Sequence, residues 1–329
     1  MGIKIVLAPR IIRLLFIIGL ILQPLSLLAD SSNTILIFRA FGDNFAQTSQ
    51  GIKDDLGGDF AIIEKIIEHE TSISVIANHI NNSKPTLIAL IGNIPARLYT
   101  HYQKKNPNID FPPSVVMSAL YVDRLLRQIK NAQGIRHEVP AVTSIVNIRS
   151  LLKKPVRRVG VLYRKWMRDY IKLNAEFCKQ EGIELVAVEI PNAITVKRLS
   201  YHLKHLINKD IDALWVANDN ALISPQLIQN AWIPNIKQFN KNIIVGIENL
   251  TSTSLDFGTF AVVSDQYALG IQAAGLITDI IDEGSNKFEQ KKVYEPISVK
   301  KSLNTKLLQK RNILVNPSQL DTLDKIIDN

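Results

Sequence analysis

The chain has 329 residues, of which 46% are hydrophobic and 21% are charged. This composition is typical of a packed globular protein and excludes a disordered or fibrous chain. The length is sufficient for two lobes, each with a core of its own. The formal net charge of +9 would suit a nucleic-acid surface, but many basic residues at 153–168 flank a predicted strand, where solvated surface charge is the simpler interpretation.

The first 29 residues have the three-part order of a secretory signal peptide. Positive charges come first, an apolar run follows at 14–22, and small residues lead to Ala29. We predict cleavage after Ala29. The alternative is an uncleaved anchor, but a spanning helix needs about 20 apolar residues, and Gln23 and Pro24 interrupt this run. The mature protein is therefore predicted to be periplasmic and not itself membrane-spanning.

The single cysteine, Cys178, lies in a predicted helix. No cysteine follows the predicted cleavage site closely enough to carry a lipid anchor, and one cysteine cannot form an internal disulfide. A buried thiol is the expected role, because no neighbouring residue would lower its pKa.

Short apolar runs alternate with amphipathic segments through the rest of the chain. The apolar runs carry Val, Ile and Leu on consecutive positions, which is typical of strands covered on both faces. Predicted strands occupy 34–38, 60–64, 86–91, 114–118, 157–163, 184–190, 212–217, 242–247 and 259–264. Predicted helices occupy 44–56, 71–82, 165–181, 195–208, 222–232 and 266–283.

This alternation predicts an α/β fold with parallel sheets and right-handed crossovers. It restarts after 119–156, a stretch that contains Pro140 and Pro155. Two sheets of four to six strands fit common sizes better than a single sheet of nine or more. We place the first crossing between two Rossmann-like lobes near 141–153.

Signatures of enzymes are absent from the sequence. There is no G-x-G-x-x-G, no phosphate-binding G-x-x-x-x-G-K-[ST] and no G-x-S-x-G. His202 and His205 are three apart on a predicted helix, but no third ligand stands at a suitable spacing for a metal. No catalytic residue, cofactor or metal is predicted.

Four segments carry a resemblance to a known family. They are 156–163, 212–220, 244–248 and 263–274. In this order they resemble the ABC-transporter substrate-binding proteins of the tryptophan/tyrosine-associated type, which are periplasmic binding proteins of the type I fold. Family members often carry Thr-Gly-Val-Ser before the first crossing; this chain has Gln-Gly-Ile-Arg at 133–136, a departure that concerns the ligand more than the fold.

The resemblance implies two lobes joined by a three-segment hinge. The first lobe would comprise 30–145 plus 263–290, and the second 146–262 plus 291–329. The expected function is the solute-binding component of an ABC-type uptake system, with a small polar, amino-acid-like ligand in the cleft and an inner-membrane ABC permease as partner. The expected protein is a monomer that binds no nucleic acid and is not an enzyme.

Ligands of open parallel sheets bind beyond the carboxyl ends of the strands. Thirteen residues at or near these ends are therefore predicted to bind the ligand. Asp219 would pair with a ligand ammonium or cap the next helix, Arg39 would clamp a carboxylate or form a surface ion pair, and Gly92 would admit close backbone approach or permit a turn. The full set is Arg39, Phe41, Gly92, Asn93, Ser118, Tyr163, Asn218, Asp219, Asn220, Glu248, Ser264, Asp265 and Tyr267.

Three rival functions use the same fold. A periplasmic sensor would present the bound solute to a membrane receptor instead of a permease. An exported enzyme is a lesser alternative. A gene regulator of the lactose-repressor kind would need an N-terminal helix-turn-helix, and this chain has a predicted export signal there.

Overall fold

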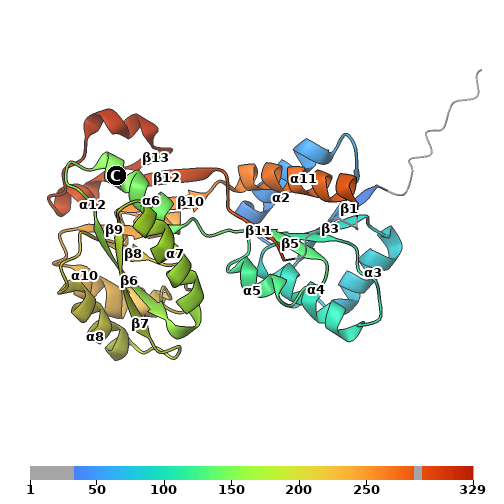
Figure 1. Cartoon of the computed structure of the whole chain (residues 1–329), viewed down its shortest axis with the longest axis horizontal. Helices are drawn as coiled ribbons and strands as arrows, with labels where there is room; N and C mark the ends of the chain where they lie inside the picture. The colour runs from blue at the N-terminus through green and yellow to red at the C-terminus, as the bar shows by residue number, and fades with distance from the viewer. Residues whose placement is uncertain (1–32, 285–290, 329) are drawn as a thin grey trace, which may run out of the picture.

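The computed structural model describes residues 33–284 and 291–328. The predicted signal peptide, 1–29, lies outside these ranges. Within them, no helix combines the length and the apolar character needed to cross a bilayer. Two lobes lie side by side, each built on its own sheet (Figure 1).

The first lobe contains a six-stranded, fully parallel sheet in the order β11-β5-β4-β3-β1-β2. Its strands are β1 (Thr34–Ala40), β2 (Ala61–Ile67), β3 (Leu87–Ile91), β4 (Ser114–Met117), β5 (Ala132–Ile135) and β11 (Val293–Tyr294). Its helices are α2 (Asp43–Leu56), α3 (Ile73–Ser83), α4 (Asn93–Lys105), α5 (Val122–Leu126) and α11 (Gln266–Glu283).

The second lobe contains a seven-stranded sheet in the order β13-β12-β10-β9-β8-β6-β7, in which only the β10–β12 pair is antiparallel. Its strands are β6 (Arg158–Arg164), β7 (Glu184–Ile190), β8 (Ala213–Val216), β9 (Asn242–Val245), β10 (Phe260–Ser264), β12 (Val299–Asn304) and β13 (Lys325–Ile327). Its α-helices are α6 (Ala141–Leu151), α7 (Arg168–Gln180), α8 (Val196–Ile207), α9 (Pro225–Leu227), α10 (Ile233–Ile236) and α12 (Thr305–Lys310). Shorter turns are η1 (Lys165–Met167), the π-helical η2 (Ile228–Trp232), η3 (Glu248–Thr251) and η4 (Pro317–Thr322).

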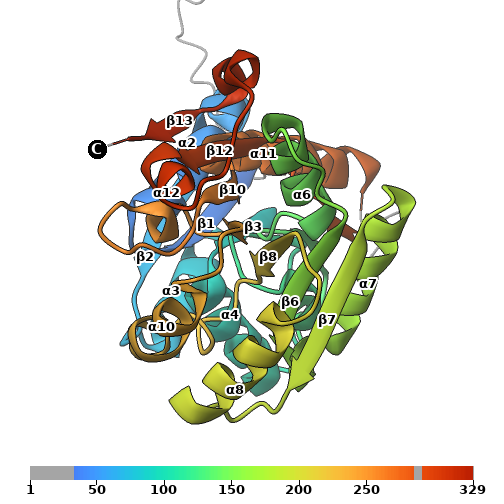
Figure 2. The same ribbon diagram turned by 90° about the vertical axis from the view of Figure 1, so that its left-hand side faces the viewer.

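Helices cover both faces of each sheet, as Figure 2 shows for the second lobe. Alternate residues of β3 therefore enter two different cores: Ile88 and Leu90 pack on one face, and Leu87, Ala89 and Ile91 on the other. All five are fully buried. This explains the consecutive apolar residues that identified the strands, and the predicted α/β fold with two lobes is confirmed.

All nine predicted strands are present, with ends that differ by up to three residues. Four strands were missed, namely β5, β11, β12 and β13. β5 reads Ala-Gln-Gly-Ile and is buried despite its polar residues, and β12 carries two lysines near the edge of its sheet. Among the α-helices, α4, α5, α6 and α12 were missed, and α10 lies just beyond the helix predicted at 222–232.

The chain crosses between the lobes three times. The first crossing runs from β5 to α6 at 136–140, since α6 packs against α7 and β10 of the second lobe. It thus precedes the predicted position, 141–153. The second crossing lies at 264–265, between β10 and α11, and the third at 295–298, between β11 and β12.

Hydrogen bonds hold the three crossings together. Ser264 Oγ donates to the His137 carbonyl at 2.8 Å, which links the first and second crossings. Asp265 N donates to the Ser298 carbonyl at 3.1 Å, which links the second and third. Arg136 Nε donates to Glu295 Oε1 at 2.9 Å, which links the first and third. The three crossings therefore form one hydrogen-bonded hinge.

Cys178 is fully buried in α7, and burial raises the pKa of its thiol to about 11. The thiol is therefore protonated at neutral pH, as expected of a core cysteine.

Helices α2 and α11 meet at two glycines. A methyl group on Gly51 would lie 2.3 Å from the Tyr267 carbonyl oxygen, and one on Gly270 would lie 2.2 Å from that of Thr48. Both distances are below van der Waals contact. The return of α11 to the first lobe thus depends on direct contact between the two helix backbones.

We predict that Gly270→Ala destabilises the first lobe by roughly 1–3 kcal/mol, because the added methyl must push the helices apart. Gly275→Ala, in the same helix, is the matched control. Nothing lies within 4 Å of a methyl group there, so the better helix propensity of alanine should stabilise the protein by about 0.5–1 kcal/mol. Thermal unfolding of both variants checks this, and equal melting temperatures would contradict it.

Two titratable residues follow each other in the first crossing, the half-buried His137 and the buried Glu138. Burial lowers the pKa of His137 to about 4 and raises the pKa of Glu138 to about 7. Glu138 Oε1 accepts a hydrogen bond from Tyr121 N at 2.6 Å. Among the described residues, its Oε2 and His137 Nδ1 have no hydrogen-bond partner.

These two residues have opposite effects on stability as the pH falls. The raised pKa of Glu138 adds stability as the pH falls from about 7 toward the unfolded value of 4.5. The lowered pKa of His137 removes stability as the pH falls from the unfolded value of 6.5 toward about 4. Over the shared window, the two contributions largely cancel.

Glu138→Gln should remove this compensation. Between pH 6.5 and 4.5, the variant should lose roughly 2 kcal/mol more unfolding free energy than the wild type, because only the His137 contribution remains. Urea unfolding at the two pH values measures the difference. Glu176→Gln, on the exposed face of α7, is the control, and a wild-type pH profile in Glu138→Gln would disprove the compensation.

Candidate functional site

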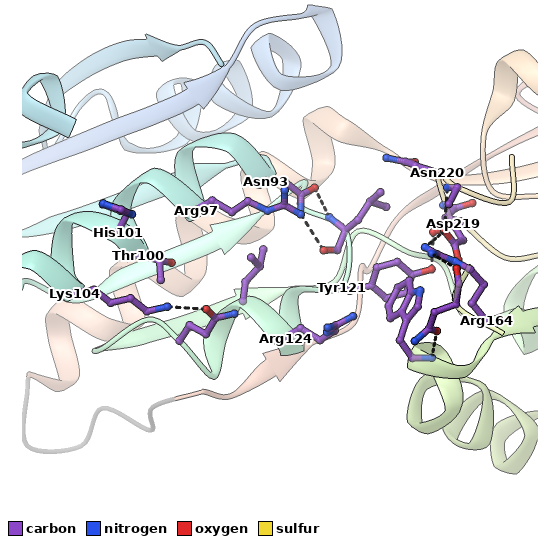
Figure 3. Close-up of a pocket in the computed structure, with 17 residues that line it drawn as sticks. Asn93, Arg97, Thr100, His101, Lys104, Tyr121, Arg124, Arg164, Asp219 and Asn220 are labelled. Carbon is purple, nitrogen blue, oxygen red and sulfur yellow. Dashed lines mark hydrogen bonds and ion pairs between the residues drawn. The ribbon is translucent and has the colours of Figure 1, made fainter. Parts of the chain in front are cut away.

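A cleft of about 900 Å³ lies between the two lobes. It is lined by residues that follow the carboxyl ends of strands in both sheets and by residues along α4 and around α5 (Figure 3). The first lobe contributes Asn93, Arg97, Thr100, His101, Lys104, Leu120, Tyr121, Arg124, Leu125 and Gln128, and the second contributes Arg164, Trp166, Asn192, Asn218, Asp219, Asn220 and Ala221.

The first-lobe wall is positioned by the turn that follows β3. Gly92 has a φ of +101°, a conformation that L-residues with side chains rarely adopt, and it is the N-cap residue that precedes α4. The side chain of Asn93, the first residue of α4, makes two hydrogen bonds to the backbone of Leu120. Its Nδ2 donates to the Leu120 carbonyl at 3.1 Å, and its Oδ1 accepts from Leu120 N at 3.0 Å. This pair fixes the loop after β4 against the start of α4.

An ion pair organises the second-lobe wall. Arg164, the last residue of β6, donates from Nε and Nη2 to the two carboxylate oxygens of Asp219, each at 2.6 Å. Asp219 is 2% exposed and also accepts from Ala221 N at 3.1 Å. Both carboxylate oxygens are therefore occupied within the protein.

Aromatic side chains line the cleft where the two lobes touch. Tyr121, from the first lobe, donates its hydroxyl to the Asn218 carbonyl at 2.5 Å. Its ring meets Trp166 of the second lobe edge-on, with 4.6 Å between centroids. The guanidinium carbons of Arg124 and Arg164 lie 4.7 and 5.5 Å from the Trp166 ring centroid. These contacts connect the two lobes next to the hinge.

Four of the thirteen nominated residues line this cleft: Asn93, Asn218, Asp219 and Asn220. Asn218 also donates from Nδ2 to the Gly246 carbonyl at 3.2 Å, which ties the end of β8 to the end of β9. For Asp219, the structure shows the local capping contact to Ala221 N, one of the two roles expected of it.

Three more nominated residues belong to the hinge and its supports. Ser118 Oγ lies 2.9 Å from Thr48 Oγ1 and donates to Gln266 Oε1 at 2.9 Å. Ser264 bonds the first crossing, as described above, and Asp265 caps α11. All three act where the chain passes between the lobes, and none is among the cleft-lining residues.

Three nominated charged or polar side chains are engaged inside their own lobes, away from the cleft lining. Arg39 forms an ion pair with Glu64, but both side chains are mostly buried, so the pair is not the surface ion pair that was expected. The hydroxyl of Tyr163 donates to Glu189 Oε2 at 3.4 Å. The carboxylate of Glu248 accepts from Lys325 Nζ at 2.6 Å.

The remaining nominated residues, Phe41, Gly92 and Tyr267, also lie outside the cleft lining. Phe41 is 73% exposed. The hydroxyl of Tyr267 donates to Asp54 Oδ2 at 2.9 Å, within the first lobe. Gly92 has the turn-forming role described above.

Sequence reasoning missed most of the basic and aromatic lining. Arg97 lies on α4, a helix that was not predicted although Ala96, Tyr99 and Tyr102 form a buried stripe at a spacing of three. Arg164 was missed because β6 extends one residue beyond its predicted end, so that Arg164 faces the cleft and its neighbour Tyr163 does not.

No metal site was found among the residues the structure describes, where no three His, Cys, Asp or Glu side chains gather closely enough to hold an ion. His202 contacts the ring of its neighbour Tyr201 on α8.

We predict that Asp219→Asn destabilises the second lobe on the order of 3 kcal/mol, because it leaves Arg164 unpaired in a mostly buried position. Asp210→Asn is the control. Asp210 pairs with Arg158 but is 89% exposed, so its loss should change little. Urea unfolding compares the two variants, and equal stabilities would show that the Arg164–Asp219 pair contributes nothing.

Comparison with known proteins gives a family and a fold. The model of the family described as "ABC transporter substrate binding protein" matches residues 43–326. A search of curated proteins gives no match.

Several solved structures share the architecture. An ABC domain in complex with L-Trp from Streptococcus pneumonia is 17% identical, with a TM-score of 0.57. A ligand-free, open substrate-binding protein with adhesive properties from Clostridium difficile is 15% identical, with a TM-score of 0.66. A conserved domain protein from Vibrio cholerae is 16% identical, with a TM-score of 0.56. Each comparison covers 90% of this chain and 100% of the other.

At these identities the structures establish the fold, which is that of type I periplasmic binding proteins, and the family model establishes the relationship. The chain belongs to the ABC transporter substrate-binding protein family.

Proposed function

We propose that this protein is the periplasmic solute-binding component of an ABC-type uptake system. It would hold a small polar solute in the cleft between its lobes and deliver it unchanged to an inner-membrane permease. The family is one of substrate-binding proteins, which supports a small-molecule ligand and a permease partner. We further propose that the mature protein is monomeric and acts by binding alone.

One observation carries this proposal: side chains from both lobes line a single cleft beside a hydrogen-bonded hinge. A solute in this cleft would contact strand ends of both sheets at once. Rotation about the three crossings would then bring the walls together. Closure removes the solute from water, so each satisfied polar contact gains strength and each unsatisfied one becomes costly. Selective capture follows without any covalent step.

The nature of the solute is the finer part of the proposal. The L-Trp bound in the Streptococcus pneumonia structure supports an amino-acid-like ligand here. Its carboxylate would face the arginines of the cleft. The role first considered for Asp219, pairing with a ligand ammonium, has no support from the geometry, because Arg164 occupies both of its oxygens.

Binding should change the fluorescence of one tryptophan. Trp166 is half-buried and lines the cleft, whereas Trp215 and Trp232 are 4% and 2% exposed in the core of the second lobe. When the solute retained by the purified protein is identified by mass spectrometry and added back, emission should shift and the radius of gyration should fall as the lobes close.

The matched variants are Trp166→Phe, which should abolish the fluorescence response, and Trp232→Phe, which should retain it. X-ray scattering with and without solute measures closure. If no solute binds, or if binding leaves both signals unchanged in the wild type, the proposed function is wrong.

A further inference from the structure

We infer that the solute carries a net negative charge, supplied by carboxylate or phosphate groups, and that Arg97 and Arg124 bind it. This inference rests on the proposed function and narrows the chemical class of the ligand. It excludes neutral solutes and cations as the preferred ligand, and it narrows an amino-acid-like ligand to one with an acidic side chain in place of an ordinary zwitterion.

The first-lobe wall of the cleft is basic. Arg97, His101 and Lys104 are spaced by four and three residues, so they share one face of α4, and Arg124 extends the wall from α5. Figure 3 shows these side chains along the first-lobe side of the cleft. All four are exposed to solvent.

These cations lack counter-charges. In the described ranges, no carboxylate lies within ion-pair distance of Arg97, Lys104 or Arg124. Lys104 donates to the neutral amide of Gln128 at 3.0 Å, and Arg124 stacks on the neutral ring of Trp166. Their charge is therefore available to a ligand.

The opposite wall supplies no free carboxylate. Among the described residues that line the cleft, Asp219 is the only acidic one, and its charge is matched by Arg164 through two bonds of 2.6 Å. A ligand ammonium would therefore find no anionic partner in the cleft. The lining carries four permanent cations, Arg97, Lys104, Arg124 and Arg164, against this one carboxylate.

Basic side chains on an open surface are ordinarily just solvated. Here they stand in a concave site, and closure would bring the second lobe over them and remove water. Without a counter-ion, such closure is opposed by desolvation of the guanidinium groups and by their mutual repulsion, which grows when water no longer screens it. An anionic solute removes both penalties, and planar guanidinium groups suit the paired oxygens of carboxylate and phosphate. Binding of an anionic solute therefore stabilises the closed state.

Arg97 and Arg124 are the central residues of this arrangement. Arg97 lies one turn beyond Asn93, near the start of α4, and Arg124 already reaches the second lobe, 4.7 Å from the Trp166 ring centroid. Lys104 lies near the far end of α4, where it would contribute to attraction over a longer range.

The test combines native mass spectrometry of the retained solute with a thermal-shift panel on the purified full chain. The panel contains succinate, glycerol 3-phosphate, L-glutamate, L-glutamine, glycerol and putrescine, and calorimetry then measures the affinity of each solute that binds. We expect an anionic retained solute, stabilisation by anions and not by glycerol or putrescine, and affinity that weakens as salt is raised. Succinate and glycerol 3-phosphate distinguish carboxylate from phosphate recognition.

Arg97→Gln and Arg124→Gln should each weaken binding of the anion about tenfold or more, since each removes a charge-assisted hydrogen bond. The matched control is Lys105→Gln, an exposed cation on the same helix that does not line the cleft, and it should leave affinity within about twofold. Arg97→Lys should recover part of the loss.

The outcomes separate the inference from the proposed function. Closure around a neutral, zwitterionic or cationic solute, with anions unbound, would overturn the charge assignment and leave the solute-binding function intact. Equal losses in Arg97→Gln and Lys105→Gln would overturn the role of Arg97. If no solute is retained and none in the panel closes the lobes, the proposed function itself fails.

Discussion

The hinge constrains everything else in this structure. Because the chain passes between the sheets three times, at 136–140, 264–265 and 295–298, the lobes cannot separate or slide freely. Hydrogen bonds between the crossings turn three single strands of backbone into one unit. Only rotation about that unit remains, and rotation opens or closes the cleft that the strand ends line.

Two serines that look like ligand-binding groups in the sequence serve this hinge. Ser118 donates to Gln266, and Ser264 donates to the His137 carbonyl, at the points where α11 and β4 approach the crossings. Buried polar groups must find partners, and these find them within the hinge. Their exposure to a ligand is thereby lost, although they lie at strand ends as ligand-binding residues would.

The electrostatics of the cleft depend on the pairing of Arg164 with Asp219. A carboxylate at the end of a central strand would otherwise make the second-lobe wall negative. With both oxygens held by a guanidinium group, the wall becomes nearly neutral, and the basic face of α4 and the side chain of Arg124 determine the charge that a ligand meets. The same pair places Arg164 beside Trp166, next to the contact that Tyr121 makes across the cleft.

The local sequence was sufficient for the fold class and for part of the site. Consecutive Val, Ile and Leu identified nine of the strands, because a strand covered on both faces is apolar at most positions. Asn93 and Asn218–Asn220 followed from their place at strand ends. The pairing of polar residues and the orientation of α4 toward the cleft depend on contacts between segments that are far apart in the chain. Arg164 and Asp219, for example, are 55 residues apart in the sequence. No local pattern encodes those contacts, and only the packed lobes decide them.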